Sequence, residues 1–166
     1  MKKLLLLLFL LTSFSTFADW TLEKKVDDFE ETTNYFIVSD IVRPNKPMSF
    51  PWNKASAFLH FNCQTKSIDM MTTMDVFNLN NDPIYSGNTT YIDINVKADR
   101  VIHRNIIVEH ELFSNYISFD KGQTERILLN ANEVVIQLDH YTQGLRTYSF
   151  NMEGLEPLLI NQCSRN

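Results

Sequence analysis

The side chains best suited to acid–base or metal chemistry in this chain are its four histidines, His60, His103, His110 and His140. No two of them have the i, i+4 spacing that places two metal ligands on one helix face, and no HExxH pattern occurs. On a strand, Glu109 would point to the opposite face from His110. We therefore interpret each histidine as a strand-end or surface residue, and we predict no metal site and no cofactor.

Nucleophilic catalysis has no local signature either. The serines lack a GxSxG context, and the four glycines form no phosphate-binding loop. The sequence thus predicts no catalytic residue and favours a protein that is not an enzyme. A hydrolase or metal-dependent enzyme that uses His110 or His140 with nearby carboxylates stays open as an alternative.

Residues 1–18 have the order of a cleavable secretory signal peptide. Lys2 and Lys3 precede an apolar run over 4–11, and small or polar residues lead to Ala18, after which we expect cleavage. The run is too short for a membrane-spanning helix, which needs about 20 mostly apolar residues. We expect an exported protein of the periplasm, or alternatively of the extracellular space, with no stable membrane anchor after cleavage.

Residues 19–166 form the exported part, and their charge limits the partners. Loss of the two signal lysines leaves 13 of the 15 basic residues against 20 acidic ones, so the net charge changes from −5 to −7. This negative net charge argues against a nucleic-acid partner and against docking to anionic lipid head groups. The length suits a single domain with its own core.

Cys63 and Cys163 are the only cysteines. An even number in an exported chain is most simply explained by one disulfide. Two buried free thiols or a metal pair are the alternatives, although no CxxC spacing supports a metal. The disulfide would tie the end of the chain to an early strand.

Alternation of apolar and polar residues recurs along the chain, which predicts a mainly β fold, a small antiparallel β-sandwich or barrel-like domain. Within 57–63, Ala57, Leu59 and Phe61 share the face of Cys63 and should be core, and a turn at 64–66 would lead into a hairpin with 67–73. Further strands are predicted at 35–39, 92–97, 106–113, 116–119, 134–138 and 146–152, and a short helical or turn-like piece at 125–131.

The C-terminal segment has helical rather than strand spacing. Leu155, Leu158, Leu159 and Cys163 fall at i, i+3, i+4 and i+8, on one face of a helix. The packed face therefore carries Cys163, and its thiol would point inward toward the core-facing Cys63.

Four aromatic residues are candidates for binding a partner: Phe50, Trp52, Phe58 and Tyr141. Aromatic anchors concentrate at protein interfaces. The alternative is that these side chains complete or cover the core. The first two lie in a proline-rich stretch, 43–52, which predicts an irregular connection because proline cannot donate to a β ladder.

Several short segments together resemble a known family. They are Trp20, the acidic, Thr-rich stretch 27–33, the strand 57–61 ending at Cys63, the segments 131–138 and 147–150, and a helix from Gly154 to Cys163. This layout resembles the VasI/TagO-like small exported accessory proteins of type VI secretion clusters. The resemblance implies an envelope location, a β-rich fold with one disulfide, and no assigned catalytic residue.

The leading hypothesis is a non-enzymatic periplasmic accessory or binding protein that acts through another envelope protein, in association with type VI secretion. An inhibitor or immunity-type protein is a further alternative, since an acidic surface could meet a basic enzyme of the envelope.

Overall fold

The computed structural model describes residues 20–27, 31–73, 84–86, 89–111, 115–140 and 142–164. The predicted signal peptide, residues 1–18, lies outside the described residues. Among the helices of the described ranges, none has the length and apolar character needed to cross a membrane.

The chain folds mainly into strands, with short helical segments between them and at the end. In chain order the elements are β1 (Trp20–Asp27), β2 (Thr32–Ser39), η1 (Trp52–Lys54), β3 (Ala57–Asn62), β4 (Ser67–Thr72), β5 (Ile84–Ser86), β6 (Thr89–Ala98), β7 (Val101–Glu111), β8 (Tyr116–Ser118), α2 (Gln123–Leu129), β9 (Glu133–His140), β10 (Gly144–Asn151), α3 (Leu155–Leu158) and η2 (Leu159–Cys163).

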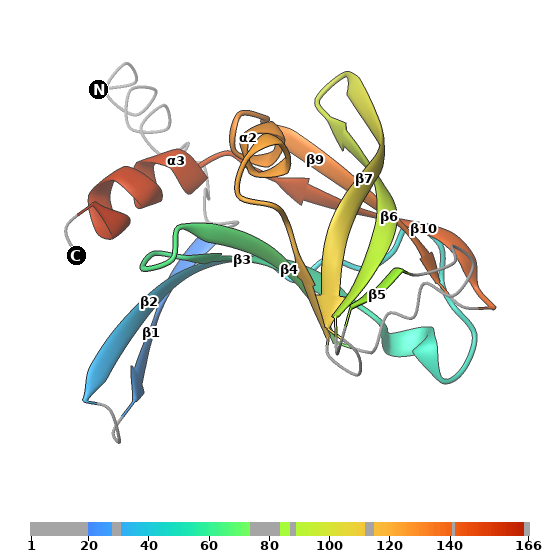
Figure 1. Ribbon diagram of the computed structural model, residues 1–166, viewed down its shortest axis with the longest axis horizontal. Helices are drawn as coiled ribbons and strands as arrows, with labels where there is room; N and C mark the ends of the chain where they lie inside the picture. The colour runs from blue at the N-terminus through green and yellow to red at the C-terminus, as the bar shows by residue number, and fades with distance from the viewer. Residues whose placement is uncertain are drawn as a thin grey trace, which may run out of the picture.

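The ten strands of the described residues belong to one antiparallel sheet. Nine follow the order β1-β2-β3-β4-β8-β7-β6-β9-β10, and β5 pairs with β6. The sheet is strongly arched, with α2 and α3 on the same side of it, while the β1–β2 hairpin projects away from the rest (Figure 1). The predicted mainly β, antiparallel fold is confirmed, and so is the hairpin of β3 and β4.

The segment that follows β2 joins two distant parts of the sheet. Val42 and Ala57 of β3 exchange two backbone hydrogen bonds of 2.8 and 2.9 Å. Three residues later, the N–H of Asn45 donates to the carbonyl of Thr147 on β10 over 2.9 Å. The side-chain oxygen of Asn45 accepts the N–H of Thr147 over 3.0 Å. Residues 42–45 thus bridge β3 and β10. The sheet is barrel-like between these two strands, whereas β1 stands at an open end of the strand order.

Strand alternation accounts for the core. Ala57, Leu59 and Phe61 are buried on β3, as predicted, and the even-numbered residues 92–96 are buried on β6. Tyr148 and Phe150 of β10 are the largest fully buried side chains. These residues belong to one cluster, which Leu128 of α2 and Leu155 of α3 complete. The core is therefore continuous from β3 to β10.

The C-terminal helical segment is fastened to this core by the predicted disulfide. Gly154 precedes α3 with a φ of 88°, a left-handed conformation that suits glycine. Leu155 and Cys163 are both buried. Cys163 is bonded to Cys63, which follows β3, with a Cα–Cα distance of 4.8 Å. The helix and the bond are confirmed as the sequence predicted them.

Breaking this disulfide should lower the free energy of unfolding. The bond closes a loop with a sequence separation of 100 residues, for which loop-closure entropy gives about 4.7 kcal/mol as an upper guide. We expect a loss of about 2–5 kcal/mol in chemical denaturation of the reduced protein. The double variant Cys63→Ala/Cys163→Ala is the control and should resemble the reduced protein. Equal stability of the oxidised and reduced forms would contradict this role.

Candidate partner-binding surface

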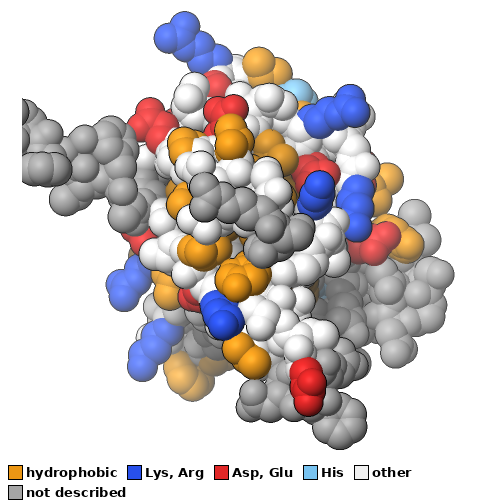
Figure 2. All heavy atoms as spheres, turned by 90° about the vertical axis from the view of Figure 1, so that its left-hand side faces the viewer, with side chains coloured by type: hydrophobic (Ala, Val, Ile, Leu, Met, Phe, Trp, Pro, Cys, Tyr) orange, Lys and Arg blue, Asp and Glu red, His pale blue; other side chains and the backbone are white. Residues whose placement is uncertain are grey.

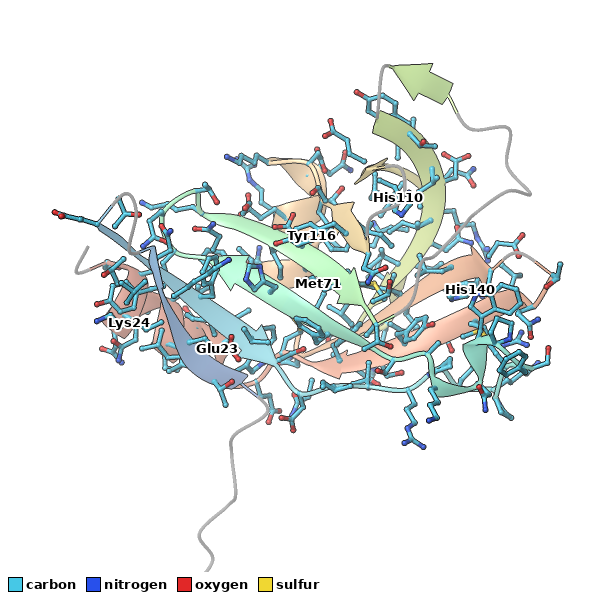
Figure 3. The ribbon with its side chains drawn as sticks, turned by 90° about the horizontal axis from the view of Figure 1, so that it is seen from below. Glu23, Lys24, Met71, His110, Tyr116 and His140 are labelled. Carbon is cyan, nitrogen blue, oxygen red and sulfur yellow. A yellow bond between two sulfur atoms is a disulfide. The ribbon has the colours of Figure 1, made fainter. Side chains whose placement is uncertain are left out.

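The irregular connection between β2 and β3 forms a loop that is attached by hydrogen bonds to β10 and to the turn between β9 and β10. We call residues 43–54 the aromatic loop. Besides Asn45, Ser49 anchors it, because its N–H and its Oγ both donate to Oε1 of Gln143 over 2.9 Å. Met48 is buried between these two anchors. Figures 1 and 3 show η1 and the β9–β10 turn at the same end of the molecule.

Phe50 is the most exposed large hydrophobic side chain of the described residues, at 85% of its full area. The backbone around it is ordered by hydrogen bonds from Trp52 N–H to Ser49 O and from Ala55 N–H to Trp52 O, each 2.9 Å. Trp52 begins η1 and is half-buried. The loop therefore holds Phe50 in solvent on a fixed backbone.

The aromatic loop is basic although the whole chain is acidic. Arg43, Lys46 and Lys54 are exposed, and residues 43–54 contain no acidic residue, whereas the whole chain has a net charge of −5. Exposed positive charge around an apolar side chain favours a partner that is locally negative.

The structure separates the four predicted aromatic candidates into different surroundings. Phe50 and Trp52 lie together on the aromatic loop. Phe58 lies on β3, half-buried and opposite Met71 of β4, on the sheet face turned away from the core. Tyr141 lies outside the described residues.

A second aromatic group occupies the face of β2, β3, β4 and β8 that points away from the core. The ring of His60 stacks on Phe36 with a centroid distance of 4.4 Å, and its Nδ1 lies 3.1 Å from the hydroxyl of Tyr116. Figure 3 views this face and labels Tyr116 and Met71 on neighbouring strands. This group has no local signature in the sequence, because its residues come from separate strands.

Burial governs the titration of this outer face. It lowers the pKa of His60, which nearby Glu23 partly offsets, and it raises the pKa of Asp69. Burial also raises the pKa of Tyr116. The imidazole is thereby favoured in its neutral form, in which it can bond to the tyrosine hydroxyl.

The strand-end interpretation holds for two of the histidines. His110 and His140 lie at the ends of β7 and β9 and are buried, at 4% and 3% exposed. It is wrong for His60, which lies within β3 and is half-buried because neighbouring strands cover it. His110 faces the core opposite Ile117, whereas Glu109 is exposed. Across the described ranges, no three His, Cys, Asp or Glu side chains gather in a way that could hold a metal ion.

His140 is buried and is contacted by a tyrosine of the adjacent strand β10. Its Nε2 lies 2.9 Å from the hydroxyl of Tyr148. Burial lowers the pKa of His140 to about 4, and the Arg146 guanidinium acts in the same direction. Burial also raises the pKa of Tyr148 to about 12. Both groups are thus neutral at neutral pH, beneath the turn that anchors the aromatic loop.

In comparisons with known proteins, no family model, curated protein or solved structure matches this chain.

His140 makes the fold sensitive to acid. The unfolded chain binds a proton at this side chain near pH 6.5, but the folded protein does so only near pH 4. The unfolded state therefore holds more protons between these values, and stability falls as the pH drops. We expect the unfolding free energy to lose about 2 kcal/mol from this group between pH 7 and pH 5.

The measurement is chemical denaturation at several pH values, together with NMR titration of the His140 ring. His140→Gln should flatten the pH dependence over this range. A ring that titrates near pH 6.5 in the folded protein would refute the account.

Proposed function

We propose that this protein is a non-enzymatic binding protein of the bacterial envelope that acts through a protein partner, which it contacts with the aromatic loop. The observation that carries this proposal is the 85% exposure of Phe50 on a loop that side-chain and backbone hydrogen bonds fix to β10 and to the β9–β10 turn. Full burial of such a side chain in a partner would contribute about 1.5–3 kcal/mol.

A fixed backbone matters as much as exposure. A loop that is already ordered loses little conformational entropy on binding, so more of the contact energy appears as affinity. Arg43, Lys46 and Lys54 surround the aromatic anchors with positive charge. The partner surface that fits is an apolar pocket with an acidic rim.

The resemblance to VasI/TagO-like accessory proteins favours an envelope component of a type VI secretion machine as this partner. The disulfide is compatible with export to an oxidising compartment. Neighbouring genes for the other secretion components would support this assignment. Toxin or prophage neighbours would instead favour an envelope inhibitor.

The binding role is tested by placing a photo-crosslinking residue at position 50 in the exported protein inside cells. A specific crosslinked partner is expected at this position. The matched control is Val101, which is 57% exposed and lies next to the β6–β7 turn, at the top of Figure 1 and away from η1. The same product from both positions would contradict a specific site.

With the crosslinked partner purified, Phe50→Ala should weaken binding about 30-fold, the effect of losing an interface hot spot. Lys46→Glu should mainly slow association at low salt. Val101→Ala should change neither. Unchanged affinity of Phe50→Ala would reject the aromatic loop as the contact surface.

A further inference from the structure

The outer edge of β1 is the most regular unpaired edge that the described strands offer. β1 pairs with β2 over eight consecutive positions, from Trp20↔Ser39 to Asp27↔Thr32, without a bulge, and it stands at the end of the strand order. In an antiparallel pair, alternate residues turn both their N–H and C=O away from the partner strand. Alternate residues of β1 therefore offer both groups on the side away from β2.

Nothing in the described part of the chain covers this edge. Residues 21–26 are all exposed, and the backbone hydrogen bonds found outside the strand ladders include none to β1. The hairpin projects away from the arched sheet (Figure 1), on the side that faces the viewer in Figure 2, and the described elements leave the edge of β1 uncovered. It also has no proline, one of the residues that commonly blunts an edge strand.

The side chains of β1 carry apolar and charged residues on opposite faces. Leu22 and Val26 are 40% and 51% exposed and share the face of the buried Trp20. Glu23 and Lys25 lie on the other face, where both act on the pKa of His60. Figure 3 labels Glu23 and the neighbouring Lys24 on this strand. Around Lys24, the strand thus carries two matched sets of exposed residues. Leu22 and Val26 are both apolar, and Glu23 and Lys25 have opposite charges.

We propose that β1 pairs with β1 of a second copy of this chain, antiparallel and with the two-fold axis at Lys24. In this register Leu22 faces Val26 of the second copy, and Glu23 faces Lys25 of the second copy. Symmetry makes each of these pairs twice. Apolar and opposite-charge pairs directly across strands are stabilising, whereas like charges are destabilising.

The neighbouring symmetric registers are worse. A centre at Glu23 places two glutamates together and sets Leu22 against Lys24. A centre at Lys25 places two lysines together and sets Glu23 against Asp27. The register centred at Lys24 has one like-charge pair, Lys24 with Lys24 of the second copy. Of the three registers, it is the one that places apolar residues opposite apolar residues and glutamate opposite lysine. Lysines often protect an edge from unspecific pairing. Lys25 favours a second copy of β1 as the partner strand, because that strand places Glu23 opposite it.

The contact is small, because only two edge strands and their side chains meet. Interfaces of this size support transient complexes. A dimer that dissociates in the micromolar range is therefore expected, and it would present two aromatic loops to the envelope partner.

The test uses the exported protein purified from the periplasm, with its mass measured by sedimentation from low micromolar to near-millimolar concentration. Glu23→Lys should weaken dimerisation about ten-fold or more, because lysine then faces Lys25 twice. Lys25→Glu should do the same. The combined swap, Glu23→Lys/Lys25→Glu, recreates the opposite pairs and should restore the dimer, which also shows that the hairpin still folds.

Cysteine crosslinking checks the register. Lys24→Cys should form a disulfide-linked dimer, since residues at the axis have Cα atoms about 4.5–5.5 Å apart. Leu22→Cys is the matched control and should not, because its two copies are offset by about 13 Å along the strands. A monomer at every concentration, a swap that fails to restore pairing, or equal crosslinking at both positions would overturn the proposal.

Discussion

The structure depends on the few hydrogen bonds with which residues 42–45 connect β3 to β10. An arched sheet can enclose a core on one face when strands that are far apart in its order are held together. Val42 pairs with Ala57, and Asn45 pairs with Thr147. The side chains of Leu59, Tyr148 and Phe150 can then be buried in one cluster. The disulfide between Cys63 and Cys163 adds the C-terminal helix to the same core.

The same connection positions the surface that we propose for binding. Four residues after Asn45, Gln143 holds Ser49, so the backbone next to Phe50 is fixed in a position where the phenylalanine side chain is exposed. The buried His140–Tyr148 pair supports the turn that carries Gln143. The proposed binding surface and the stability of the fold are thereby linked, because changes that loosen β10 or the β9–β10 turn would also release the aromatic loop.

Much of the fold could be predicted from the sequence, and the site only in part. Strands with one buried face, such as β3 and β6, could be predicted because residues for the core alternate with residues for the outer face along the sequence. β1 was missed because Lys24 interrupts its apolar alternation, and β7 begins earlier than predicted because Val101 and Ile102 are exposed. The burial of His140 depends on Tyr148 in the next strand. Phe50 and Trp52 were identified by residue type, but the hydrogen bonds that fix their loop have no local pattern.

The central claim is that the aromatic loop is covered by a protein in the envelope. It is tested most directly by oxidative footprinting of the exported protein in intact cells and after purification. The account predicts that Phe50 and Trp52 are labelled far less in cells than in the purified protein, while Leu145, which is also exposed, is labelled equally in both. Equal labelling of Phe50 in the two samples would contradict it.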